Sequence, residues 1–135
     1  AAAHGNGVFV LAVTSNPEGG QVQLASLAGG RSVAQAVVDE LATRNRGAAP
    51  LGSFGVVFGA TATQRGVDLT QLNGPILAPG VGAQGGTPED VRQLFGDAPA
   101  VLPSVSRSVL REGPVVEALR SAVARQVELF AFLRG

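Results

Sequence analysis

Four short runs of apolar residues punctuate the chain, and none of them alternates apolar with polar positions. Each run is rich in Val, Ile, Leu or Phe, which is typical of a strand that is buried on both faces, as in a parallel sheet. The runs cover residues 7–13, 54–59, 75–78 and 100–105. The pattern therefore predicts four buried parallel strands.

Stretches with helical periodicity follow these runs. Residues 32–42 carry apolar side chains at positions 33, 37, 38 and 41, and Ser32 is the expected N-cap. Residues 64–72 form a weaker helix candidate, whereas residues 114–133 form a long amphipathic one. Together with a further helix after residue 87, the order is strand–helix repeated four times, which predicts an α/β fold with right-handed crossovers.

Two architectures fit this order of elements: half of an open doubly wound sheet, or half of an eight-stranded (β/α) barrel. Four barrel strands alone would leave two unpaired edges and an uncovered inner face. The sequence contains no methionine and opens in a segment that looks like the end of a helix. We therefore expect a piece of a longer protein.

Composition narrows the candidate chemistry. The formal net charge is zero, so no general attraction to nucleic acid or to an anionic membrane surface is expected. The chain has no cysteine and a single histidine, so no thiolate metal site can form and no metal site is predicted. All ten basic residues are arginines, which means that a mechanism requiring a lysine could not be completed by this chain.

Residues 80–85 read Gly-Val-Gly-Ala-Gln-Gly and so satisfy the dinucleotide fingerprint G-x-G-x-x-G. In that fingerprint the third glycine already lies in the helix that holds the pyrophosphate. Here Thr87 is the expected N-cap and Pro88 the first helical residue, so the glycines form a free loop. Glu89 and Asp90 would repel a phosphate from the mouth of this helix, which is expected to run to about residue 95. The position where an acid should meet a ribose offers Ser and Arg instead, so the dinucleotide interpretation fails.

A barrel offers the glycine loop another role. Phosphate commonly binds between the loops after the seventh and eighth barrel strands, and the glycine loop and Ser106-Arg107 would occupy these two places. Gln84 can donate an amide and Arg107 a two-pronged guanidinium, while glycines let backbone N–H groups approach an anion. The alternative is that the loop only turns the chain and Arg107 is a solvated surface residue. The residue types alone support the phosphate-binding loop and the simple turn equally well.

Three segments carry a resemblance to a known family: "PGVGAQGG" at the end of one apolar run, "TSNPEG" upstream and "PSVSR" downstream. Together they resemble orotidine 5′-phosphate decarboxylase, and the second segment is similar to the actinobacterial-type branch. The resemblance covers residues 1–135 and implies the C-terminal half, strands five to eight, of a single (β/α)8 TIM barrel. It implies cofactor-free and metal-free decarboxylation of orotidine monophosphate (OMP) to uridine monophosphate (UMP) in pyrimidine biosynthesis.

The resemblance also implies roles for individual residues. Gln84 and Arg107 bind the substrate phosphate, Ser15 hydrogen-bonds the pyrimidine ring, and the loop that begins at Pro79 closes over the nucleotide. The family often has Gly where this chain has Ser106, a change that keeps the backbone N–H. The family's D-x-K-x-x-D motif is not in this sequence, so no catalytic residue is assigned to this chain. The implied partners are the N-terminal half of the enzyme and a second copy in a cytoplasmic homodimer.

Two other functions remain open. The chain could be a noncatalytic half-barrel that binds a phosphate ligand, which its lack of lysine favours if it works alone. It could also come from another barrel that handles sugar phosphates, against which "TSNPEG" and "PGVGAQGG" argue together.

Overall fold

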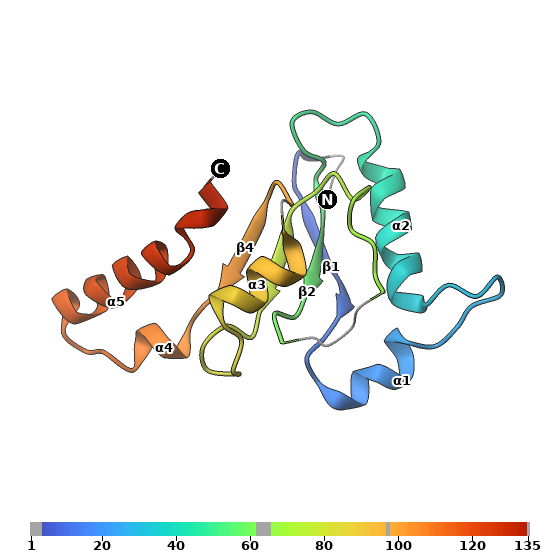
Figure 1. Cartoon of the computed structure of the whole chain (residues 1–135). Helices are drawn as coiled ribbons and strands as arrows, with labels where there is room; N and C mark the ends of the chain where they lie inside the picture. Colours follow the sequence, from blue (N-terminus) through green and yellow to red (C-terminus); the bar gives the residue numbers. More distant parts are fainter. Residues whose placement is uncertain (1–3, 62–65, 97, 135) are drawn as a thin grey trace.

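The protein is described by a computed structural model that covers residues 4–61, 66–96 and 98–134. Four parallel strands form one sheet, with helices after them (Figure 1). The strands are β1 (Val8–Val13), β2 (Phe54–Phe58), β3 (Ile76–Pro79) and β4 (Val101–Ser104). The α-helices are α1 (Gly20–Gln23), α2 (Val33–Asn45), α3 (Pro88–Phe95), α4 (Arg107–Leu110) and α5 (Val116–Leu129), with short 3-10 helices at Pro17–Gly19 and Ala131–Arg134. The predicted α/β class with a parallel sheet is confirmed.

The strands lie in the sheet in the order β1-β2-β3-β4, the same as their order in the chain. Val10 pairs with Val56, Val56 with Ile76, and Ile76 with Val101, so these residues form one row across the sheet, and the register of β1 shifts between Leu11 and Val13. A doubly wound sheet reverses its strand order at a switch point, whereas a barrel always adds the next strand on the same side. The observed order has no reversal.

One face of the sheet forms the core with α2 and α3. Val56, Phe58, Ile76 and Ala78 are buried on this face, together with side chains of both helices. The rings of Phe58 and Phe95 meet edge to face, with centroids 5.6 Å apart. The apolar stripe of α2 and the short apolar face of α3 therefore find their partners on the same side of the sheet.

The opposite face of the sheet is open, which corrects the expectation that all four strands are buried on both faces. Phe9 and Leu11 of β1 are 42% and 59% exposed, and Leu102 of β4 is 49% exposed. The physical reason is that the helices packed on the sheet lie on the other side, and no element of the described residues covers this one. The apolar runs were predicted correctly as strands, but the sequence does not tell which layer covers each face.

Two helix starts agree with their predicted caps. The Ser32 side chain accepts a hydrogen bond from the backbone N–H of Gln35. Thr87 and Asp90 form a capping box, in which the Thr87 hydroxyl accepts from the Asp90 N–H and the Asp90 carboxylate accepts from the Thr87 N–H.

The predicted helix over residues 114–133 is shorter in the structure. Val115 has extended backbone and serves as the N-cap, so α5 begins at Val116 and ends at Leu129. Much of its apolar stripe is exposed: Val116, Val123 and Val127 are between 43% and 52% exposed. Figure 1 shows α5 at the side of the molecule beyond β4, where it projects away from the sheet.

The weak helix candidate over residues 64–72 is wrong in the part that the structure describes. Residues 64 and 65 lie outside the described residues, and residues 66–72 form turns without a helix. Gly66 has a φ of +136°, which a helix does not allow. The Gln35 side chain accepts from the Asp68 N–H and donates to the Asp68 carbonyl, so it competes for the backbone groups that a helix would use.

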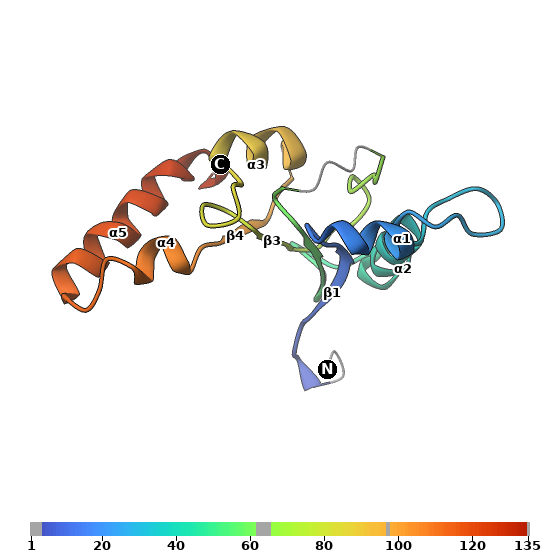
Figure 2. The same ribbon diagram turned by 90° about the horizontal axis from the view of Figure 1, so that it is seen from below.

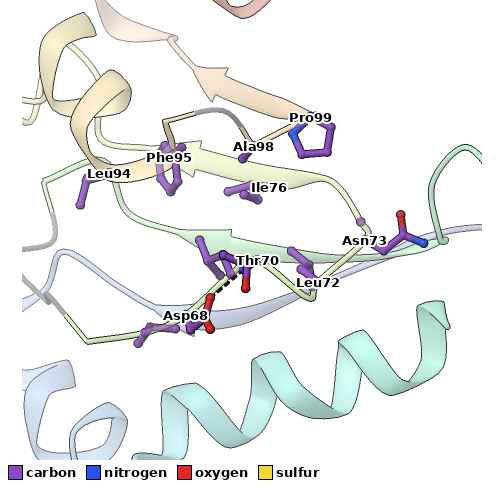
Figure 3. Close-up of a pocket in the computed structure, with 12 residues that line it drawn as sticks. Asp68, Thr70, Leu72, Asn73, Ile76, Leu94, Phe95, Ala98 and Pro99 are labelled. Carbon is purple, nitrogen blue, oxygen red and sulfur yellow. Dashed lines mark hydrogen bonds between the residues drawn. The ribbon is translucent and has the colours of Figure 1, made fainter.

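These turns form one wall of a cavity of about 630 Å³ (Figure 3). Leu72 and Ile76 lie opposite Leu94 and Phe95 of α3, and Ala98 and Pro99 close one end. Because Asn73 and Pro99 precede β3 and β4, this cavity reaches the amino ends of these strands.

Candidate functional site

The carboxyl ends of the four parallel strands share one edge of the sheet. In Figure 1 this edge faces downward, and Figure 2 looks onto it from below. The end of β3 and the segments after β1, β3 and β4 carry the five candidate residues, which are Ser15, Pro79, Gln84, Ser106 and Arg107. Open α/β folds and barrels place their ligand sites at this edge.

Ser15 follows β1 and is half-buried beside the end of β2. A Cβ built on Gly59 would lie 3.1 Å from the Ser15 backbone nitrogen and 3.5 Å from its Cβ, so a glycine at position 59 allows the two strand ends to approach. The neighbouring backbone is fixed by Gln23, a buried side chain of α1. Its Oε1 accepts from the Thr14 N–H at 2.9 Å and its Nε2 donates to the Thr14 carbonyl at 3.3 Å. Gln23 therefore holds the backbone that presents Ser15.

Pro79 is the last residue of β3 and pairs with Ser104 of β4. Its carbonyl accepts a hydrogen bond from the Ala60 N–H at 2.8 Å. Ala60 in turn lies against Gly86, where an added Cβ would come within 3.3 Å of the Ala60 side chain. Pro79 thus connects the end of β3 to the segment after β2 through a hydrogen bond.

The glycine loop, residues 80–86, is closed on itself. Gly80, Gly82 and Gly85 all have positive φ, and the N–H groups of Gly82 and Gly86 donate to the carbonyls of Gly86 and Gly80. The N–H groups of Ala83 and Gly85 also donate within the loop. In this conformation the N–H groups of Gly82, Gly85 and Gly86 are used by hydrogen bonds within the loop, so they do not face a ligand.

Gln84 is the polar residue of this loop, and it is exposed. Its Oε1 lies 3.0 Å from the position that a Cβ on Gly80 would occupy. The Thr61 hydroxyl lies 3.6 Å from the same position. The amide of Gln84 and the hydroxyl of Thr61 therefore converge at the mouth of the loop.

Ser106 and Arg107 connect β4 to α4. Ser106 is the N-cap of α4, but its side chain makes no capping hydrogen bond, and its carbonyl accepts from the N–H groups of Val109 and Leu110. Arg107 is the first residue of the helix and is exposed. Both residues are therefore available at the same edge of the sheet as the glycine loop.

The glycine loop and α4 touch each other. A Cβ on Gly82 would overlap the Ser108 hydroxyl, which places Ser108 directly against the loop. Figures 1 and 2 both show the loop between β3 and α3 beside α4. Gln84 and Arg107 are thus carried by two segments in contact.

The electrostatics after the loop exclude an anion from the start of α3. Hydrogen bonds from the Thr87 side chain and then from its backbone hold the pKa of Asp90 below its ordinary value, so this carboxylate stays charged at neutral pH. Glu89 adds a second negative charge in the same turn. The observed helix start is the predicted one, with Thr87 as the N-cap and both acids in the first turn.

Sequence reasoning missed three residues of this edge. Gln23 gives no sequence signal, because a glutamine in a short helix is usually solvated. Thr61 and Ser108 could have been suspected, since Thr61 lies in the segment just after β2 and Ser108 directly follows Arg107. Within the described ranges, no group of three His, Asp or Glu residues could hold a metal ion. None of the helices in these ranges is long and apolar enough to cross a membrane.

Comparisons with known proteins agree on one family. Residues 1–122 match the family model described as orotidine 5′-phosphate decarboxylase / HUMPS family. The chain is 61% identical to an orotidine 5′-phosphate decarboxylase of Salinispora arenicola over 126 residues, which are 93% of this chain and 45% of the relative. It is 55% identical to the enzyme of that name from Streptomyces coelicolor, covering 90% of this chain and 44% of the relative.

A solved structure supports the same likeness. A crystal structure from Streptomyces avermitilis, assigned as an orotidine 5′-phosphate decarboxylase, superimposes with a TM-score of 0.84 at 51% identity. The match covers 94% of this chain and 45% of that one. The chain therefore spans less than half the length of the relatives that it matches.

Proposed function

Because the chain belongs to the orotidine 5′-phosphate decarboxylase / HUMPS family, we propose that it is part of an orotidine 5′-phosphate decarboxylase. The reaction releases CO₂ from OMP and adds a proton to the vacated ring carbon, giving UMP. In this proposal the chain supplies the groups that bind the phosphate and the pyrimidine. The observation that carries it is the arrangement of Gln84 and Arg107 on two contacting segments at the carboxyl edge of the sheet.

We further propose that residues 1–135 are the C-terminal half of a (β/α)8 barrel, with β1 to β4 as the last four strands. The unreversed strand order and the open apolar face of the sheet support this proposal. A cavity of about 420 Å³ lies between β1 and α2, and one of about 370 Å³ between β4 and α5. Both are lined mainly by apolar side chains, as expected where further strands and helices of a barrel would pack.

The phosphate grip consists of Gln84, Arg107 and the backbone N–H of Ser106. An arginine can hold two phosphate oxygens at once, and a glutamine amide adds a neutral donor without competing charge. Pro79 fixes the start of the loop that carries Gln84, since its ring restricts φ and its carbonyl is tied to Ala60. This grip supplies binding energy far from the reacting carbon, which can drive closure of the loop and offset strain at the carboxylate.

Ser15 is the proposed contact to the pyrimidine ring. It lies two strands away from the glycine loop at the same edge, so a nucleotide with its phosphate near Arg107 could extend its base toward β1. Gln23 makes this contact directional, because it fixes the backbone of the residue before Ser15.

The chemical step needs a group that this chain does not contain. Loss of CO₂ leaves negative charge on a ring carbon, and a nearby ammonium is the natural stabiliser and proton donor in a water-poor site. The sequence has no lysine, so in the complete enzyme the ammonium comes from outside these residues. The same proposal includes a cytoplasmic homodimer without metal or cofactor, which rests on the family resemblance alone.

The phosphate role is tested by comparing ligands with and without a phosphate in the complete enzyme. Arg107→Ala should lower kcat/KM for OMP at least about tenfold and weaken UMP binding by a similar factor. Binding of uridine should stay unchanged, because uridine has no phosphate to lose. Arg120→Ala, a change at an exposed arginine of α5, is the matched control. An unchanged kcat/KM for OMP would remove Arg107 from the phosphate site.

A second candidate function is a noncatalytic module that binds a phosphate ligand, which the lack of lysine favours if these residues work alone. Mass analysis of the purified protein separates the two candidates. If the protein is a complete enzyme, its mass and peptide composition include residues beyond these 135, among them a lysine within a D-x-K-x-x-D segment, and it turns over OMP. A protein of this chain alone that binds UMP without turnover supports the binding module.

A further inference from the structure

Ser108 lies in close contact with the glycine loop at Gly82, whereas another glycine of the loop has no such neighbour. A side chain at Gly82 would overlap the Ser108 hydroxyl and would stand 3.5 Å from the Ser108 Cβ. At Gly85, in the same loop and also with a positive φ, an added Cβ would meet nothing within 4 Å. Gly82 is therefore the point at which the loop contacts α4.

The Ser108 hydroxyl is buried and has no hydrogen-bond partner among the described residues. A buried polar atom without a partner lowers stability, so such atoms in native proteins call for an explanation. Folding alone would favour alanine at this position. The serine is thus better explained by the loop that it touches than by the stability of α4.

Space behind the loop makes this contact important. A cavity of about 240 Å³ lies beside Gly82, with Ser108 and Arg111 on one side and Gln126 and Leu129 of α5 on another. On the side of this cavity, the packing partners of the loop are the side chains that line it. The side chain of Ser108 is one of these partners, and it directly follows Arg107 in the chain.

We propose that Ser108 is a positioning residue of the phosphate grip, whose side chain packs on Gly82 and fixes the glycine loop relative to Arg107. The distance between Gln84 and Arg107 is then already suited to one phosphate before the ligand binds. Preorganisation of this kind favours ligand binding, because less ordering remains to be done when the ligand arrives. This inference rests on the proposed function, since it assigns the phosphate to these two side chains.

Three single variants of the complete enzyme test the contact. Gly82→Ala introduces both the overlap with Ser108 and an unfavourable positive φ, whereas Gly85→Ala introduces only the latter. We expect KM for OMP to rise at least about tenfold for Gly82→Ala and about threefold for Gly85→Ala. Ser108→Ala should raise KM about threefold with kcat unchanged and without lowering the urea midpoint of unfolding, because no partner is left unpaired.

The decisive measurement is the combination of changes. Ser108→Ala removes the overlapping atom, so in its background Gly82→Ala should cost about as much as Gly85→Ala. The effects of Ser108→Ala and Gly85→Ala should simply multiply. If the effects at positions 82 and 108 also multiply, or if Ser108→Ala lowers stability while leaving KM unchanged, the inference is wrong. Should Gly82→Ala not fold, Ser108→Val enlarges the contact from the other side and should raise KM by a similar factor to Gly82→Ala.

Failure of the proposed function is visible separately. An unaltered protein that does not decarboxylate OMP contradicts that function, and the same variants are then compared by their Kd for inorganic phosphate. Coupling between positions 82 and 108, but not between 85 and 108, still supports the inference in that measurement. Equal Kd values for all variants, or no phosphate binding at all, overturn it.

Discussion

The Asn45 side chain at the end of α2 pairs with the backbone of Phe54 at the start of β2, in addition to the pairing of Phe54 with Val8 of β1. Its Nδ2 donates to the Phe54 carbonyl at 2.7 Å, and its Oδ1 accepts from the Phe54 N–H at 3.1 Å. The same Nδ2 donates to the Leu72 carbonyl at 2.8 Å, so one amide joins α2, β2 and the segment before β3. Gly52 and Gly74 leave the space for it, because a Cβ at either position would collide with the Asn45 side chain.

Asn45→Ala should therefore lower the free energy of unfolding by about 3 kcal/mol, because buried backbone groups lose their partners. Urea unfolding measures the effect. Thr43→Ala is the control on the same helix, since the Thr43 hydroxyl bonds only the Asp39 carbonyl in an exposed position, and a change below about 0.5 kcal/mol is expected there. Equal effects of the two changes would mean that the Asn45 network does not hold these segments together.

The capping box of α3 predicts a pH dependence. The lowered pKa of Asp90 comes first from the Thr87 hydroxyl and then from the Thr87 N–H, both of which bond the charged form. A carboxyl with a lowered folded-state pKa contributes stability that is complete above its unfolded pKa and is lost as the pH falls through the folded one. Asp90→Asn should therefore reduce stability at pH 7, and the difference from the unaltered protein should disappear as the solution is acidified.

Urea unfolding of both proteins over a series of acidic pH values measures this difference. Thr87→Ala should also lower the free energy of unfolding, by about 1 kcal/mol at pH 7, and should weaken the pH dependence of the remaining Asp90. A difference between Asp90→Asn and the unaltered protein that stays constant with pH would contradict the assigned cause.

Local signals in the sequence predicted much of this fold. The caps at Ser32 and Thr87 depend on residues within three positions of each other, so the sequence alone could place them. The apolar runs gave all four strands for a similar reason. The helix prediction failed for residues 66–72 because the Gln35 side chain binds the backbone of Asp68. Gln35 lies more than thirty positions away, and no local pattern reports such a contact.

The candidate site shows the same division. The sequence suggested Gln84 and Arg107 by their donor groups after two strands, and the family resemblance implied Pro79 and the phosphate roles, so these assignments stay predictions. The closed hydrogen bonding of the glycine loop and the contact of Gly82 with Ser108 depend on how two loops pack, which the sequence does not state. The exposure of Leu11 is a further property that the sequence does not state, because it depends on which elements cover each face of the sheet.

Gln23 provides a prediction about the pyrimidine contact. Gln23→Leu keeps the size of the side chain but removes both hydrogen bonds to Thr14, so Ser15 should lose its fixed direction. In the complete enzyme, binding of both UMP and uridine should weaken about threefold to tenfold, because both ligands carry the base. Isothermal titration measures both affinities. Gln21→Leu, on the exposed side of the same helix, should leave them unchanged, and a loss confined to UMP would place the effect at the phosphate instead.

The open face of the sheet supplies the last prediction. Leu11 is 59% exposed here, and in the proposed barrel it would lie among the inward-facing side chains of the other strands. Leu11→Asp should then destabilise the complete protein by about 3 kcal/mol or more, since a carboxyl would enter an apolar interior. Val22→Asp is the matched control, because Val22 is 66% exposed on α1, away from this face. Urea unfolding in which the two variants behave alike would contradict the half-barrel proposal, whereas a large loss confined to Leu11→Asp is the result that an inward-facing position requires.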